Sequence, residues 1–247
     1  MFTNQYTHYN EQAMKDAIEH CRLCLPDEGC GIFVENKFIP YENKSPDKSN
    51  SFMISDNLFN QYYMDNKIQV IIHSHNDYPH ASKQDLIQQR EIEIPFGIIN
   101  FRKGGCEHFI FFGKGIARDP LMRRPFFFGV FDCLTLVKDY SYKWSGVDIP
   151  DPPRDLNYWK DEPLFEEAVS DVNYPVNFIN INKTKENDFI FYKFDSKYIN
   201  HVGVILPNGR ILHHFINRVS CTLPKSYHQQ HIHCGGRLDR NWREDDL

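Results

Sequence analysis

A cysteine placed at the start of an amphipathic helix is the feature that most constrains this chain. Asp132 precedes Cys133, and an aspartate side chain can cap a helix by accepting hydrogen bonds from free backbone N–H groups. Leu136, Val137 and Tyr140 follow at spacings that give a helix one apolar face. A helix N-terminus favours a thiolate and should lower the thiol pKa. The pattern predicts a nucleophile, although a lone cysteine is also compatible with a small buried apolar side chain.

Two predicted strands joined by a turn supply candidate partners for this cysteine. Residues 200–206 and 210–215 are rich in apolar side chains, and Pro207-Asn208-Gly209 between them is a turn signal. His201, on the first strand, is a candidate general base for Cys133, and a histidine on the second strand would orient it.

The length of the turn decides which histidine that is. A two-residue turn at Asn208-Gly209 places His214 on the same face as His201. A three-residue loop that ends in a left-handed glycine places His213 there instead, because a shift of one residue moves a side chain to the other face.

These residues resemble the NlpC/P60 cysteine peptidases. The likeness rests on an Asp-Cys pair that opens a helix and on the later run His-Val-Gly-Val-Ile-Leu-x-Asn-Gly-x-x-x-His, and it extends from Pro125 to Arg237. In that family the third catalytic residue lies twelve positions after the histidine, which corresponds to His213 and to the longer loop. The resemblance implies a papain-like domain with Cys133 as nucleophile and His201 as base.

The first part of the chain is expected to alternate helices and strands. Apolar residues at helical spacing predict a first helix at residues 10–25, ended by Pro26. Cys21 and Cys24 on this helix suggest a metal site with Cys30, but no fourth ligand is near in sequence, which favours a structural role. The other expected elements are strands at 31–34, 37–41, 52–54, 68–72, 96–101 and 108–112, and helices at 56–66 and 83–91.

A candidate metal site follows the strand at 68–72. His73 and His75 are two residues apart at its end, so they point the same way and can hold one metal ion. Asp85 is a candidate third ligand. The alternative is a helix cap, in which Ser82 caps the following helix and Asp85 completes the capping box.

Together with residues 26–31 ahead of a strand, this order resembles the JAMM (MPN+) zinc metallopeptidases. The resemblance implies zinc held by three ligands, a general base and a serine that stabilises the oxyanion. In this sequence they are His73, His75, Asp85, Glu28 and Ser82, in that order. The chain departs from the family at Asn76, which replaces a proline, and its loop to the serine is one residue short, so His80 or Asp77 is an alternative ligand.

The fold class expected is therefore α+β with two domains. Residues 1–117 should form a JAMM/MPN-like α/β sandwich and residues 125–247 an NlpC/P60 domain. Residues 118–124, which contain Pro120 and three arginines, are expected to be a linker.

A JAMM-like half followed by an NlpC/P60-like half resembles the tail assembly protein K family of lambda-like siphophages. The resemblance rests on short sequence segments that occur in the same order as in that family: Arg124-Pro125-Phe126, Pro153-Arg154, Asn200-His201 and Leu212-His213-His214. The resemblance implies a phage protein in the virion tail tip, or in the host cytoplasm during assembly, with tail-tip proteins as partners. The net charge of −5 and the absence of a basic block argue against nucleic-acid binding.

Three further expectations come from composition. The N-terminal ten residues lack the apolar core of a secretory signal, and no apolar run is long enough for a membrane span. Seven cysteines in a chain of this length indicate free thiols in a reducing compartment.

Two classes of function remain open. In the first, the protein is a cysteine peptidase that cuts peptide stems or cross-links of peptidoglycan, with a second zinc site. In the second, it is an assembly factor that binds or processes tail proteins without acting on the wall.

Overall fold

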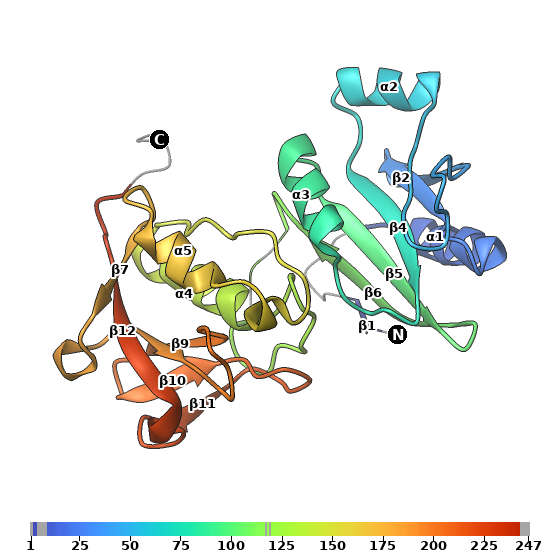
Figure 1. Ribbon diagram of the computed structural model, residues 1–247. Coiled ribbons are helices and arrows are strands. Elements are labelled where there is room, and N and C mark those ends of the chain that lie inside the picture. The colour runs from blue at the N-terminus through green and yellow to red at the C-terminus, as the bar shows by residue number, and fades with distance from the viewer. Residues whose placement is uncertain (1, 4–8, 117, 119, 243–247) are drawn as a thin grey trace. The chain divides into compact units, whose positions relative to one another are not determined.

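The computed structural model describes residues 2–3, 9–116, 118 and 120–242. The chain divides into two compact units, Met1–Ala117 and Arg118–Leu247. Each unit combines one six-stranded sheet with helices (Figure 1), so the α+β class is confirmed. Among the described residues, no helix is both long and apolar enough to cross a membrane.

The sheet of the first unit is mixed. Its only described parallel pairs are β1 with β6 and β4 with β5. In spatial order the strands are β1 (Phe2–Thr3), β6 (Gly105–Phe112), β5 (Phe96–Arg102), β4 (Val70–Asn76), β2 (Cys30–Val34) and β3 (Lys37–Tyr41).

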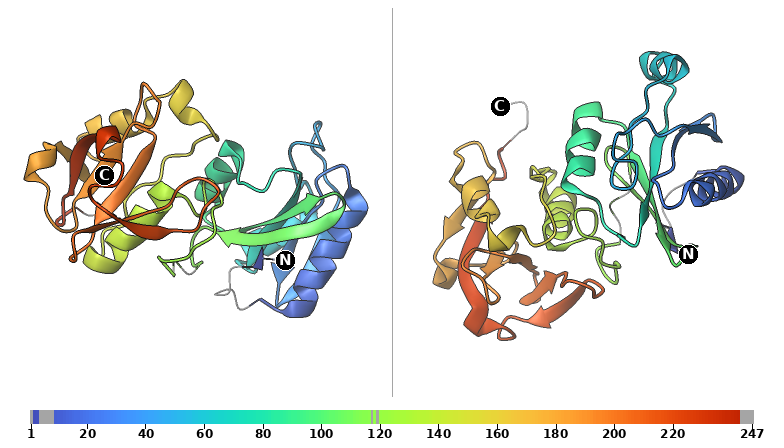
Figure 2. Two further views of the ribbon diagram at one scale, coloured as in Figure 1. Left: turned by 90° about the horizontal axis from the view of Figure 1, so that it is seen from below. Right: turned by 45° about the vertical axis from the view of Figure 1, so that its right-hand side comes forward.

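Helices cover both faces of this sheet, as Figure 2 shows for α1 and α3. Helix α1 (Glu11–Cys24) begins at Asn10, whose Oδ1 accepts hydrogen bonds from the next turn. Its buried face, Ala13, Ala17 and Cys21, packs on Phe33, Ile72 and other residues of the sheet. Helix α3 (Lys83–Ile92) carries Asp85 on the opposite side, and α2 (Asn57–Met64) presents no buried residue.

One predicted strand is absent from the first unit. Residues 52–54 have no regular secondary structure, so the prediction of a strand there is wrong. The reason is tertiary packing: the segment does not join the sheet, and the Phe52 ring stacks on the ring of His73 in the middle of β4 with 4.4 Å between centroids.

The sheet of the second unit is antiparallel throughout its described pairs. Its strands lie in the order β11 (Cys221–Pro224), β10 (Arg210–His213), β9 (His201–Ile205), β8 (Phe189–Tyr192), β12 (Ile232–Leu238) and β7 (Val176–Ile179). Helices α4 (Cys133–Ser145) and α5 (Leu164–Ser170) pack on one face, where they share an apolar core with β8, β9 and β10 (Figure 1). The described residues of this unit also form short 3-10 segments at Tyr158–Lys160, Ile181–Lys183 and Gln229–His231.

The segment expected to be a linker makes firm contacts within the second unit. Arg124 is buried, and its Nη1 lies 2.6 Å from Oδ2 of Asp139 on α4. Arg118 pairs with Asp148, 3.0 Å from Nη1 to Oδ1. These arginines therefore tie residues 118 and 120–124 to α4 and to the residues that follow it.

Candidate active site

The start of α4 has the geometry that the sequence predicts. Oδ1 of Asp132 accepts hydrogen bonds from the backbone N–H groups of Leu134 and Thr135, each 3.0 Å long. Thr135 returns a contact, because its Oγ1 accepts the N–H of Asp132 at 2.9 Å. This reciprocal cap fixes the first turn, and Cys133 is the first residue of the helix.

The Asp132 carboxylate makes further hydrogen bonds that the sequence analysis did not predict. Its Oδ2 accepts hydrogen bonds from the Gly129 N–H at 2.9 Å and from Nη2 of Arg154 at 2.6 Å. Arg154 is 1% exposed and also binds Asp151. Pro153-Arg154 is one of the segments that resemble the family. No residue near it in the sequence, however, indicates that Arg154 is the buried partner of the helix cap. The carboxylate that holds the cysteine in place is thus itself held by a buried guanidinium.

The protonation state of Cys133 differs from the prediction. Burial raises the pKa of the Cys133 thiol to about 12, and the neighbouring negative charge of Asp132 acts in the same direction. Backbone groups of Val202 and Leu134 and the Arg154 cation oppose this rise without overcoming it. The expectation of a lowered pKa is therefore wrong, because desolvation outweighs the backbone hydrogen bonds and the Arg154 charge that favour the thiolate.

His201 is the first residue of β9, and it is buried. Burial lowers the pKa of His201 well below its ordinary value, and the neighbouring His213 and His214 add to the effect. The ring stacks flat on Phe215, 4.4 Å between centroids and 9° between planes. Its Nε2 has no hydrogen-bond partner among the described residues. The imidazole is therefore neutral at pH 7, the form that accepts a proton.

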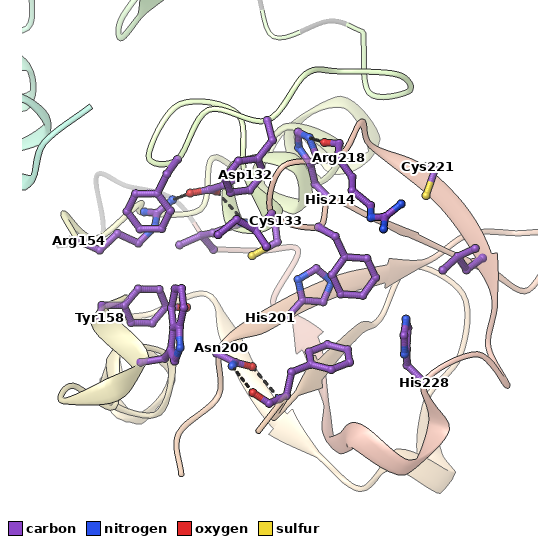
Figure 3. Close-up of a pocket in the computed structure, with 18 of the residues that line it drawn as sticks. Asp132, Cys133, Arg154, Tyr158, Asn200, His201, His214, Arg218, Cys221 and His228 are labelled. Atoms are coloured by element: carbon purple, nitrogen blue, oxygen red, sulfur yellow. Dashed lines mark hydrogen bonds and ion pairs between the residues drawn. The ribbon is translucent and has the colours of Figure 1, made fainter. Parts of the chain in front are cut away.

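Cys133 and His201 line the same cavity, whose volume is about 620 Å³. Figure 3 shows the thiol and the imidazole directed into one space. Aromatic side chains make up much of the wall: Phe126, Phe128, Tyr158, Trp159, Phe194, Phe215 and Tyr227. A cavity of this size holds a few residues of a peptide, and a neutral thiol beside a neutral base can attack a carbonyl carbon when the base removes the proton.

The loop between β9 and β10 settles the register of the histidines. The Leu206 N–H donates to the Arg210 carbonyl at 2.8 Å, and Gly209 has a φ of +74°. Residues 207–209 thus form the three-residue loop with a left-handed glycine, which confirms the second of the two alternatives. His213 pairs with Gly203 and lies on the face of His201, with 5.6 Å between the two ring centroids.

The other histidine of the pair points elsewhere. Nε2 of His214 donates to the carbonyl of Arg218 at 3.0 Å. His214 lines the cavity with Cys133, whereas His213 borders a much smaller neighbouring one. The two adjacent histidines therefore occupy different surroundings, as alternation along a strand requires.

Comparison with known proteins agrees with this geometry. Residues 123–237 match the model of the NlpC/P60 family. The matched residues include Cys133, His201 and His213. The chain is also 26% identical over 216 residues to tail tip assembly protein K of Escherichia phage N15, a match that covers 85% of this chain and 87% of the relative. For tail tip assembly protein K of Escherichia phage lambda the identity is 25% over 162 residues, covering 65% and 76%.

Solved structures of this family give weaker overall matches. A lipoprotein-like NLP/P60-family protein of Staphylococcus aureus subsp. aureus Mu50 has a TM-score of 0.33 at 20% identity, covering 48% of this chain and 37% of that chain. An NlpC/P60 family protein of Bacillus cereus ATCC 10987 has a TM-score of 0.35 at 13% identity, covering 93% and 67%.

Outside the residues that match this family, the structure brings the three predicted metal ligands together. Nε2 of His73 lies 3.1 Å from Nε2 of His75 and 3.2 Å from Oδ1 of Asp85. Nε2 of His75 lies 3.4 Å from Oδ2 of Asp85. All three side chains are buried, and their ligand atoms lie within 4.8 Å of one another.

The other residues of the JAMM-like set lie at this cluster. Oε1 of the buried Glu28 is 3.7 Å from Nε2 of His75. Ser82 and Asp85 form the capping box of α3, with the Ser82 hydroxyl 2.7 Å from Oδ2 of Asp85. The interpretation of Ser82 and Asp85 as a helix cap is therefore correct. It does not prevent Asp85 from approaching the histidines, because Oδ2 caps the helix while Oδ1 faces His73.

Residues weighed as alternative ligands do not join this group. His80 is buried and Asp77 is exposed, and among the described residues the cluster with the spacing to hold a metal ion comprises His73, His75 and Asp85 alone. The early cysteines form no such cluster either: Cys21 and Cys30 are fully buried, and burial raises the pKa of Cys30 to about 12.

Proposed function

We propose that the NlpC/P60 domain is a cysteine peptidase that cuts peptide stems or cross-links of peptidoglycan, and that the protein acts at a phage tail tip during assembly and wall penetration. One observation carries the chemical part: Cys133 and His201 line a single cavity of about 620 Å³, with the base held neutral by burial. The names of the relatives support the tail-tip setting and tail-tip proteins as partners.

The proposed mechanism starts from a neutral Cys133 thiol and a neutral His201 imidazole. When a peptide carbonyl approaches, His201 accepts the thiol proton as sulfur attacks the carbonyl carbon, so the thiolate forms only in the attack. His201 then gives this proton to the leaving amine, and a thioester to Cys133 remains. Water, activated by the same imidazole, hydrolyses the thioester. His213, edge-on to His201, is the positioning residue that keeps the ring in line.

The direct test is mass spectrometry of purified muropeptides incubated with the protein. The wild type should release peptide fragments, whereas Cys133→Ala and His201→Ala should release none while their circular dichroism stays unchanged. Cleavage by Cys133→Ala would remove the nucleophile from the proposal. If wild type leaves all muropeptides intact but binds tail proteins, the assembly-factor alternative replaces it.

We further propose that His73, His75 and Asp85 hold a zinc ion. Zinc–ligand bonds of about 2.0–2.1 Å in a tetrahedron separate the ligand atoms by about 3.3 Å. Nε2 of His73 lies at such a distance from two candidate ligand atoms, 3.1 Å from Nε2 of His75 and 3.2 Å from Oδ1 of Asp85, and one ligand atom from each of the three residues lies within 4.8 Å of the others. Nδ1 of His75 lies 3.2 Å from the Tyr78 carbonyl. A carbonyl only accepts, so Nδ1 carries the hydrogen and Nε2 is free to act as a ligand.

A zinc ion at this position would polarise a carbonyl and make a bound water acidic. Glu28 is the residue placed to remove a proton there, and Ser82 the one placed to donate a hydrogen bond to a developing oxyanion. Elemental analysis of the purified full chain should find about one zinc per chain. The double variant His73→Ala/His75→Ala should lose it, and zinc retained by that variant would contradict the assignment.

A further inference from the structure

The charges around the cavity of the NlpC/P60 domain are unevenly compensated. Asp132 and Arg154, which both line it, neutralise each other in the buried ion pair behind Cys133, and Asp151 takes a further hydrogen bond of Arg154. Arg218 also lines the cavity, and its side chain is exposed. In the described part of the chain, its guanidinium makes no ion pair or hydrogen bond. Arg218 is thus a positive charge at the cavity with its hydrogen-bond donors unused.

The position of Arg218 is built into the wall of the cavity. Its N–H donates to the Phe215 carbonyl at 3.1 Å in a tight turn, and its own carbonyl accepts the hydrogen bond from Nε2 of His214. His214 is 1% exposed, and burial lowers the pKa of its ring to about 4, so the ring is neutral with its hydrogen on Nε2. Figure 3 shows the Arg218 side chain running from this anchored carbonyl toward the side of the cavity where Cys221 lies.

From this arrangement we propose that Arg218 binds a carboxylate of the substrate, which makes the cavity selective for acidic stem peptides. The inference rests on the proposed peptidase function and adds a specificity-determining residue to it. A guanidinium presents a planar fork of donors that matches a carboxylate. Peptidoglycan stems carry carboxylates that are either free or converted to amides, so the charge at this one group distinguishes two forms of the same substrate.

The test compares matched synthetic stem peptides that differ only in a free carboxylate or its amide. Because Arg218 is exposed and solvent screens the pair, wild type should show a kcat/KM about 5-fold higher for the free acid, and the preference should shrink in high salt. Arg218→Gln should abolish the preference, Arg218→Glu should reverse it, and Arg218→Lys should keep part of it. Arg123→Gln is the control, since Arg123 is exposed but does not line the cavity. Equal turnover of acid and amide by wild type, or a preference that survives in Arg218→Gln, would overturn the inference.

A binding measurement separates this inference from the hydrolase proposal. Fluorescence titration of Cys133→Ala with the same two peptides should show about 5-fold tighter binding of the acid. If this difference is present but wild type cuts neither peptide, the carboxylate site stands and the peptidase proposal falls. If neither peptide binds, or only acidic segments of tail proteins do, the carboxylate site for stem peptides is wrong.

Discussion

Nε2 of His213 lies 3.5 Å from Sγ of Cys221, its direct partner across the ladder of β10 and β11. One nitrogen of His213, the proposed positioning residue, is therefore in contact with a thiol from the neighbouring strand. His201 stands edge-on to the same ring, so His213 is fixed between the base and Cys221. Burial lowers the pKa of His213 to about 4, and the ring stays neutral across the physiological range.

Alanine substitutions of the two adjacent histidines should therefore change different kinetic constants. His213→Ala should lower kcat, because it frees the His201 ring, but by less than the roughly 10²- to 10⁴-fold expected when the base itself is removed. His214→Ala should mainly raise KM, because it releases the turn that carries Arg218. Steady-state kinetics on a muropeptide checks both. A large fall in kcat for His214→Ala with normal kcat in His213→Ala would reverse the roles of the two residues.

A neutral catalytic pair predicts a characteristic pH dependence. Since burial raises the pKa of Cys133 to about 12 and lowers that of His201 well below its ordinary value, both groups keep their resting forms from pH 6.5 to 9. Hydrolysis should change little over this range. Alkylation of Cys133 by iodoacetamide needs the preformed thiolate, so its rate should rise about tenfold per pH unit up to pH 9. Labelling of Cys133, followed by peptide mass spectrometry, measures it. A rate already at its plateau at pH 6.5 would show a thiolate–imidazolium pair instead.

The proposed catalytic residues could be chosen from the sequence because their signals are local. Asp132 caps the helix through groups only two and three residues away, and the loop before β10 is limited to two lengths by Pro207-Asn208-Gly209. Choosing between those lengths needed the family pattern, since both are allowed by the turn residues. The structure then agreed with the longer loop.

Features that depend on residues far apart in the sequence could not be predicted from such local patterns. The partnership of Asp132 with Arg154 joins groups 22 residues apart, and the raised pKa of Cys133 depends on burial by the whole domain. Strand β12 contains Gly235 and Gly236, residues that weaken a strand pattern. At Gly236 a Cβ would lie 2.5 Å from Cε2 of Phe191, so the glycine is required by packing that only the folded chain reveals.

The buried pair of Asp132 and Arg154 should be costly to break. Arg154→Ala leaves a carboxylate that is 2% exposed without its cation, and such a loss typically costs about 3–5 kcal/mol. The free energy of unfolding of the second unit, measured in urea, should fall by this amount. The double variant Asp132→Asn/Arg154→Met should recover part of it, because no unpaired charge remains. A single variant as stable as wild type would show that the pair does not hold the helix start.

The last prediction concerns the independence of the two sites. The proposed zinc ligands all belong to the unit Met1–Ala117, and Cys133 and His201 belong to Arg118–Leu247. A thiol activated by an imidazole needs no metal, so a chelator should spare muropeptide cleavage while iodoacetamide abolishes it. If zinc is bound as proposed, its loss would also remove folding energy from the first unit and favour aggregation of the whole chain. The fragment 118–247 avoids this difficulty, since it keeps every residue of the cavity. If this fragment stays folded by circular dichroism yet loses cleavage in chelator, the second site uses a metal and the cysteine-peptidase mechanism is wrong.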